Sequence, residues 1–156
     1  MMAVSDTSPL ILLDKIGCLM ILGRLFNKVI IPPSVNMEWL RPDSYIAPDW
    51  LCVRKLSDSA MLTAEKLYLK MDKGEADAIA LFSEIQADLI LLDDLKSRKY
   101  ALTQGLPLTG TAGILVIAKN KGLIPELKPV LELLRNHNLF LSEEVFEKAL
   151  LLANEI

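Results

Sequence analysis

The sequence is poor in residues that form disulfides or bind soft metals. Its 156 residues include two cysteines, Cys18 and Cys52, and one histidine, His137. The cysteines lie in apolar stretches without CxxC spacing, which predicts buried free thiols in a reducing compartment and not a disulfide framework. The same shortage argues against a zinc site.

The chain also lacks an excess of positive charge. Its formal net charge is -3 and its sequence pI is about 5.2, so binding to nucleic acid requires a local basic patch or metal ions. Asp6, Asp14 and Lys15 interrupt the first apolar run, and the uncharged stretch 100–118 contains proline and glycine. We therefore expect a cytoplasmic protein with no membrane association.

What the chain does have is enough apolar sequence for a folded core. Hydrophobic residues make up 52% and charged residues 24% of the sequence, which is typical of a globular protein. No repeat, low-complexity stretch or linker divides the chain. We expect a single domain that spans residues 1–156.

Short apolar strands alternate with helices along the sequence. We expect strands within residues 2–6, 28–31, 50–56, 88–92 and 106–110. One helix is expected to open with Pro9 after a Thr7 or Ser8 cap, a second to begin with Ser34 as its cap, and a third to follow a Ser57 or Ser59 cap. Further helices are expected over residues 74–86, 95–104 and 111–122, and two more after residue 125. This alternation predicts a three-layer α/β/α sandwich with a central, mainly parallel five-stranded sheet.

Acidic residues stand where these strands end or where the adjoining helices begin. The carboxyl ends of parallel strands meet at one edge of a sheet, where ligands bind at the change in strand order. Four segments therefore bring carboxylates to one edge, and the acids concerned are Asp6, Glu38, Glu75, Asp77, Asp93 and Asp94.

A group of carboxylates without histidine or cysteine is typical of a site for a hard cation such as Mg²⁺ or Mn²⁺. The metal would neutralise the repulsion between the acids, polarise a phosphodiester and activate water. Each acid alone has a simpler interpretation as a helix cap, a solvated side chain or a first-turn acid. Their convergence from separate segments favours the metal site.

Glu75 and Asp77 compete for one position in this group. At roughly 100° per residue the two side chains point about 200° apart on a regular helix, so both cannot face the site. The line from Glu75 runs through Ile79 and Phe82 and is the more apolar, which favours Glu75 as the inward acid. An irregular first turn leaves both residues as candidates.

Three further residues are candidates for contacts with substrate. Arg98 lies four residues after Asp94, where it forms an ion pair or holds a phosphate. Thr109 and Thr111 flank Gly110 after the last expected strand, where their hydroxyls either orient a water molecule or cap the turn.

Five segments, in order, resemble a known family: "VSDTSPLILLDKIG", "VIIPPSVNMEWL", "GEADAIAL", "LILLDDLKSRKYA" and "LPLTGTAGILVIAKNKGLIP". Together they look like a PIN-domain protein, specifically the VapC-like branch with its "TSPLI" and "TGT-G" motifs. The resemblance implies strand order 3-2-1-4-5 and a metal-dependent endoribonuclease, the toxin of a prokaryotic type II toxin–antitoxin pair. By position it implies that Asp6 is the first acid, Glu38 the second, Glu75 or Asp77 the third, and Asp94 or Asp93 the fourth.

The resemblance also implies partners, namely an RNA substrate and a small antitoxin protein. We expect a homodimer or a toxin–antitoxin hetero-oligomer, because the terminal and first helices offer much apolar surface. Two other classes stay open, a non-catalytic PIN-like partner-binding module and a phosphoryl-transfer α/β protein. A receiver-type protein is disfavoured because only Asp58, poorly placed, follows the third strand.

Overall fold

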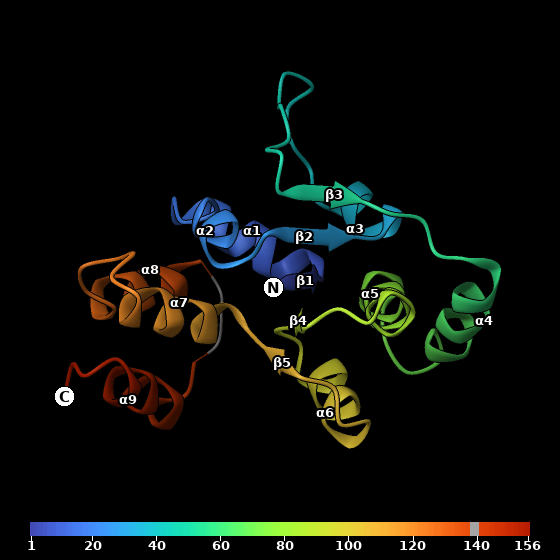
Figure 1. Cartoon of the computed structure of the whole chain (residues 1–156). Helices are drawn as coiled ribbons and strands as arrows, with labels where there is room; N and C mark the ends of the chain where they lie inside the picture. The colour runs from blue at the N-terminus through green and yellow to red at the C-terminus, as the bar shows by residue number, and fades with distance from the viewer. Residues whose placement is uncertain (138–140) are drawn as a thin grey trace.

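A parallel sheet of five strands forms the centre of the molecule (Figure 1). In this computed structural model, which describes residues 1–137 and 141–156, the strands are β1 (Met2–Ser5), β2 (Lys28–Ile31), β3 (Leu51–Val53), β4 (Leu89–Leu91) and β5 (Leu108–Thr109). Their order is β3-β2-β1-β4-β5 and every neighbouring pair is parallel. The expected parallel sheet and its order are confirmed.

Helices cover both faces of this sheet, as expected for the three-layer sandwich. The helices of the described residues are α1 (Thr7–Lys15), α2 (Ile21–Leu25), α3 (Pro33–Glu38), α4 (Asp58–Leu67), α5 (Lys73–Ile85), α6 (Leu95–Thr103), α7 (Thr111–Asn120), α8 (Lys128–Asn136) and α9 (Glu143–Leu152). Figure 1 shows α7, α8 and α9 on one side and α4, α5 and α6 on the other.

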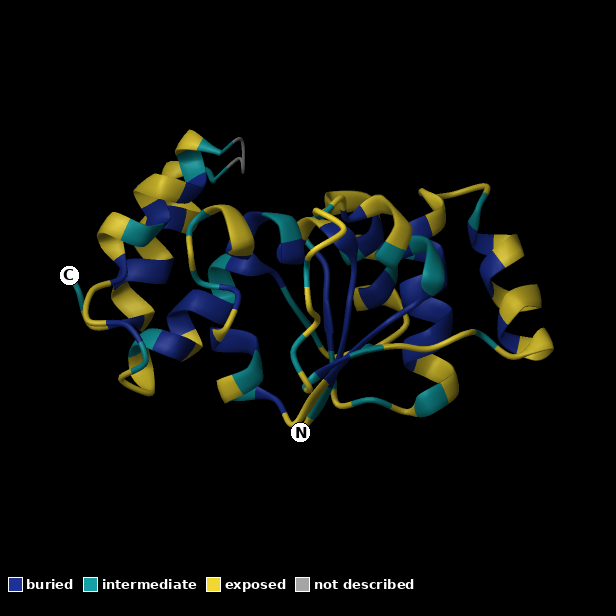
Figure 2. Ribbon diagram, turned by 90° about the horizontal axis from the view of Figure 1, so that it is seen from above, coloured by how far each residue is buried: buried dark blue, intermediate teal, exposed yellow. Residues whose placement is uncertain are grey.

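Successive residues of each strand enter opposite cores because side chains alternate across a sheet. Ala3, Val29 and Leu91 belong to one buried cluster, which contains residues of α1, α2, α7, α8 and α9. Val4, Ile30 and Ile90 belong to the other, which contains residues of α4, α5 and α6. Both faces of the central strands are therefore buried, which explains their unbroken apolar sequence (Figure 2).

Helix starts agree with the sequence prediction in part. Ser57 caps α4, where its side chain accepts a hydrogen bond from the backbone N–H of Ala60 at 3.2 Å. The caps expected at Thr7 or Ser8 and at Ser34 were wrong, because α1 begins at Thr7 itself and α3 begins at Pro33. Proline lacks an N–H and has a helical φ, so Pro33 fits the first position of α3, and the cap is Pro32, two residues before the expected Ser34.

Two other expectations need revision. Cys18 and Cys52 are free thiols as expected, but both are half-buried and not buried. The short helix α2 was not expected, because its five residues lie inside an apolar run that gives no separate periodic signal.

Among the described helices, none has the length and apolar character needed to cross a bilayer.

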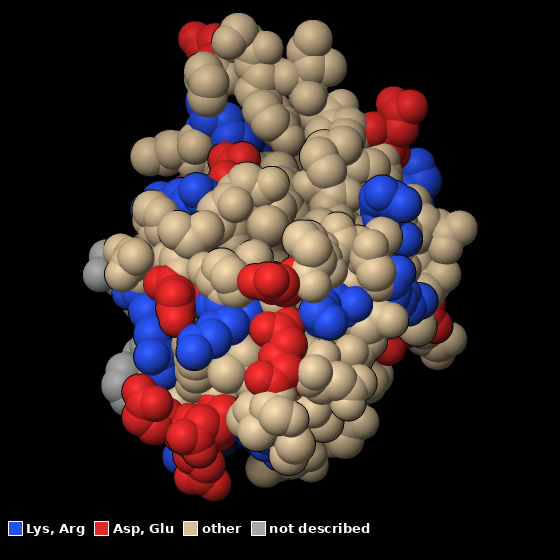
Figure 3. Space-filling model, turned by 90° about the vertical axis from the view of Figure 1, so that its left-hand side faces the viewer, with Lys and Arg blue, Asp and Glu red and all other residues tan. Residues whose placement is uncertain are grey.

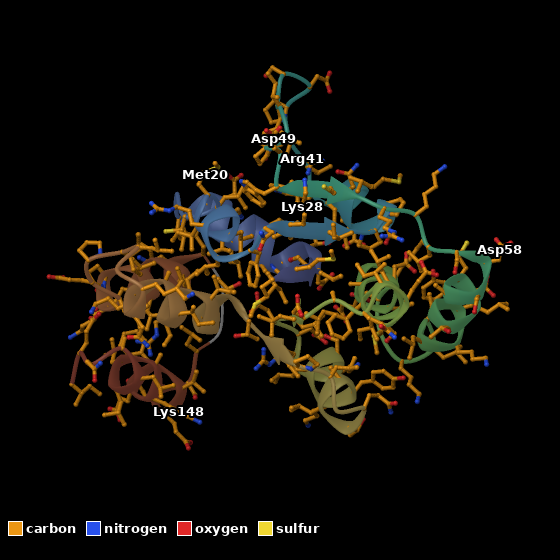
Figure 4. All side chains as sticks on the ribbon, viewed as in Figure 1. Met20, Lys28, Arg41, Asp49, Asp58 and Lys148 are labelled. Atoms are coloured by element: carbon orange, nitrogen blue, oxygen red, sulfur yellow. The ribbon has the colours of Figure 1, made fainter. Side chains whose placement is uncertain are left out.

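A loop at residues 40–50 projects from the sheet edge between α3 and β3 (Figure 1). The guanidinium carbon of Arg41 lies 4.1 Å from the ring centre of Trp39 and 5.3 Å from that of Tyr45. Lys28 of β2 donates a hydrogen bond to the carbonyl of Asp49 at 2.9 Å, and Figure 4 shows these labelled residues at the base of the loop. These contacts attach both ends of the loop to the fold.

Candidate active site

Asp6 lies directly after β1, at the carboxyl end of the central strand. Its backbone N–H donates to the carbonyl of Leu91 at 3.1 Å, so the parallel pairing of β1 with β4 continues to this residue. Asp6 occupies the N-cap position of α1, but its side chain makes no capping hydrogen bond and is only 4% exposed. A purely capping role therefore does not account for the carboxylate.

Burial raises the pKa of Asp6 from its ordinary value of 3.8 to about 7. A hydrogen bond from the backbone of Thr7 lowers this pKa, but repulsion from the nearby acids Glu38, Asp93 and Asp94 raises it further. Negative charge from two other segments of the chain thus gathers around the end of β1.

Glu75, in the first turn of α5, belongs to the same group. Its side chain is half-buried, and its pKa is raised from 4.5 to about 7, chiefly by burial and then by repulsion from Asp6 and Asp94. Asp72 and Glu38 add to this repulsion. The structure thus places Glu75 towards the other acids, as the more apolar helix line indicated.

Glu38, the last residue of α3, lies against the start of α5. Its Oε2 accepts a hydrogen bond from the hydroxyl of Thr7 at 2.9 Å. A Cβ atom added to Gly74 would lie 2.6 Å from Oε1 of Glu38, so only glycine lets the backbone of α5 approach this carboxylate. The glycine of the "GEAD" segment therefore makes room for the neighbouring acid.

Asp93 and Asp94 share the end of β4 but have different partners. Asp94 caps α6 by accepting from the backbone N–H of Ser97 at 3.1 Å. Asp93 accepts from the backbone N–H and the hydroxyl of Thr111 at 2.7 and 2.6 Å. Burial raises the pKa of Asp93, while these hydrogen bonds and the charge of Arg98 lower it.

Arg98, Thr109 and Thr111, the candidates for substrate contacts, lie around Asp93. Arg98 donates to the carbonyl of Leu92 at 2.7 Å, and among the described residues it forms no ion pair with Asp94. The hydroxyl of Thr109 fills the space where a side chain on Gly113 would stand. The polar contacts of Arg98 and Thr111 are therefore made within the protein and support the acidic edge.

Asp77 does not join the acids at the sheet edge. Its carboxylate accepts from the hydroxyls of Ser34 at 2.6 Å and Tyr68 at 2.5 Å, and from Lys73 at 3.2 Å. These partners belong to α3, to the end of α4 and to α5, so Asp77 joins three helices. Of the two candidates for the third position, only Glu75 faces the site, because the first turn of α5 is regular.

A cavity of about 450 Å³ opens beside Glu75, Asp93 and Asp94, whereas Asp6 and Glu38 do not line it. Its lining residues are Ser8, Ile11, Leu12, Lys15, Asp72, Glu75, Asp93, Asp94 and His137. The sequence analysis assigned no site role to Asp72, Lys15 or His137. Asp72 precedes the "GEAD" segment closely, but the approach of His137 from the end of α8 depends on tertiary packing and left no local signal.

The donor set suits a hard divalent cation because it consists of carboxylate oxygens. The raised pKa values of Asp6 and Glu75 reflect burial first and repulsion from neighbouring acids second, and a bound cation would offset both. Across residues 1–137 and 141–156, no three His, Cys, Asp or Glu side chains are close enough to share one ion as they stand. The acids are thus neighbours, and metal binding requires side-chain adjustment.

A five-stranded parallel sheet in the order 3-2-1-4-5, flanked by helices, defines a PIN-like α/β fold. A family model described as a PIN domain matches residues 2–155, and the chain belongs to the PIN-domain family. Members of this family are typically nucleases and generally use divalent metal ions. No curated protein matches the sequence significantly.

Proposed function

We propose that this protein is a divalent-metal-dependent endoribonuclease. The observation that carries the proposal is the pair Asp6 and Glu75, two carboxylates from distant segments whose pKa values are both raised to about 7, chiefly by burial and further by repulsion from neighbouring acids. Maintaining such repulsion lowers the stability of the fold, which favours a functional explanation over a structural one.

Asp6, Glu75 and Asp94 would hold the metal, with Asp93 and Glu38 beside them. When bound, the ion supplies polarisation of the phosphodiester, a water molecule of lowered pKa and stabilisation of the leaving oxygen. The chain itself orients these ligands. Thr7 fixes the carboxylate of Glu38, and Ser97 fixes that of Asp94, so both acids are held before substrate arrives.

The test is cleavage of a mixed single-stranded RNA pool with Mg²⁺ or Mn²⁺ and with EDTA. We expect cleavage only with metal, and a loss of at least about a hundredfold in the Asp94→Asn variant. Asp77→Asn is the matched control, because Asp77 is an acid of the same region that points away from the site. Cleavage in EDTA, or equal loss in both variants, would contradict the mechanism.

We further propose that the protein is a VapC-like toxin inhibited by a small antitoxin, and that it acts as a homodimer or a toxin–antitoxin hetero-oligomer. Support comes from the "TSPLI" and "TGT-G" motifs and from exposed apolar side chains on α3 and α4. Met37 is 78% and Leu62 is 62% exposed, and Met37 and Met61 line an apolar cavity of about 310 Å³. Such surface is typical of a protein that binds a partner.

The toxin proposal is tested by expression in a bacterial culture. Expression of the wild-type chain should arrest growth, and co-expression of a small reading frame that neighbours its gene should restore growth and yield a complex by size-exclusion chromatography with light scattering. Asp6→Asn should not arrest growth. Normal growth with the wild-type chain, despite cleavage in vitro, would leave a ribonuclease without a toxin role.

A further inference from the structure

Two cavities adjoin the acidic residues from opposite sides. The first is the cavity of about 450 Å³ that contains Lys15 and His137. The second, of about 320 Å³, is lined by Tyr68, Leu69, Lys70, Met71, Asp72, Glu75, Asp94 and Lys96. Asp72, Glu75 and Asp94 line both, so the two hollows meet along these acids.

Basic side chains from four segments line the two cavities. Lys15 ends α1 and His137 follows α8, and both line the first cavity. Lys70 follows α4 and Lys96 lies in α6, and both line the second. Among the described residues none of these four forms an ion pair, although carboxylates line the same cavities.

We propose that a single strand of RNA crosses both cavities, with backbone phosphates at Lys15 and His137 on one side and at Lys70 and Lys96 on the other. This path rests on the proposed ribonuclease function and places one phosphate over Glu75 and Asp94. It explains how a chain with a net charge of -3 holds a polyanion at an acidic site, because cations stand on both sides of the acids.

The shape and charge of the surface favour a single strand over a duplex. Lysines at two separate hollows can contact the phosphates of a flexible strand that bends along both, whereas a duplex is stiff and carries phosphates along two backbones. Figure 3 shows Lys and Arg interspersed with Asp and Glu on one side of the molecule, without a broad basic face.

The experiment measures binding separately from cleavage. All proteins carry Glu75→Gln, so that RNA stays intact in Mg²⁺, and fluorescence anisotropy follows a labelled RNA of about 12 nucleotides. Lys15→Gln and Lys96→Gln are compared with Lys148→Gln. The control residue lies on α9, where Figure 4 shows it away from the sheet, and it is exposed like the other two.

We expect Lys15→Gln and Lys96→Gln each to weaken binding about fivefold and to reduce the salt slope by about 0.7, the value for one phosphate contact on a single strand. The double variant should lose about 25-fold because the two residues contact different phosphates. Lys148→Gln should bind like its parent, and a duplex of the same sequence should bind more weakly than the single strand.

Wild-type cleavage, assayed in parallel, separates the two proposals. Lysine-dependent binding without any cleavage would support the path and contradict the ribonuclease. Cleavage by the wild-type protein combined with unchanged affinity in the lysine variants would overturn the path alone. Equal weakening by Lys148→Gln, tighter binding of the duplex, or no binding of RNA at all would also overturn it.

Discussion

Replacing Asp6 with asparagine should stabilise the metal-free protein above neutral pH while abolishing cleavage. The raised pKa means that the folded state favours the protonated carboxyl and disfavours the carboxylate. As pH rises from the ordinary value of 3.8 through about 7, the folded chain holds a proton that the unfolded chain releases, so stability falls. Asparagine carries no charge and does not undergo this loss.

The size of the effect follows from the shift. A change from 3.8 to about 7, at ~1.4 kcal/mol per pKa unit, corresponds to about 4 kcal/mol of destabilisation in the wild-type protein above pH 7. Burying the asparagine amide offsets roughly 1–2 kcal/mol of the gain. We expect a net stabilisation of about 2–3 kcal/mol, which corresponds to roughly 5–10 °C in melting temperature for a chain of this size.

The assay is thermal unfolding in EDTA at a series of pH values, followed by circular dichroism. Near pH 4, where both folded side chains are uncharged, the variant should melt slightly below the wild type because of its buried amide, and the difference should reverse and grow progressively up to about pH 8. A variant that melts below the wild type at the alkaline end, or a difference that does not change with pH, would refute the electrostatic reasoning. The first result would instead indicate a structural role for Asp6.

Three other predictions concern glycine contacts and metal. Gly74→Ala should reduce cleavage about tenfold because the new Cβ would displace the carboxylate of Glu38. Urea denaturation should nevertheless show a change in unfolding free energy below about 1 kcal/mol, since the displaced group is the end of a flexible side chain. Gly110→Ala should lower stability by about 1–3 kcal/mol in the same assay, because its Cβ would meet Asp93 at 2.6 Å and the carbonyl of Leu92 at 3.2 Å. Saturating Mg²⁺ should raise the wild-type melting temperature by more at pH 8 than at pH 6, because the acids must be ionised to bind the ion. An equal rise at the two pH values would show that the ion binds elsewhere.

Much of the fold followed from local patterns. Continuous apolar runs such as residues 89–92 predicted buried parallel strands, and the placement of acids after those runs predicted their meeting at one edge. The order 3-2-1-4-5 came from the family resemblance, and periodicity alone does not specify it. Glu75 lies near the other acids, as helix geometry favoured, but the expectation that its side of the helix is the more buried was wrong, because Asp77 is 5% exposed whereas Glu75 is half-buried.

The remaining features depend on tertiary contacts that no local pattern reveals. Asp77 lies next to Tyr68 and Ser34 only because α3, α4 and the start of α5 pack together, so its partners could not be read from its neighbours in sequence. His137 lies more than forty residues after Asp94 in the sequence and reaches the acidic cavity from the end of α8. The hydrogen bond from the Thr111 hydroxyl to Asp93 likewise requires β4 and β5 to be paired.

The central position of β1 has a consequence for how the protein folds during its synthesis. Of the five strands of the sheet, β1 is synthesised first and lies between β2 and β4, so one of its edges has no partner until residue 91 has been synthesised. Contacts between residues so far apart in the chain also slow folding. Asp6 therefore meets Asp94 only after the more than eighty residues between them have been synthesised, and before that point the acidic edge is not assembled. If the protein is the toxin we propose, this order of events delays nuclease activity until β4 has been synthesised.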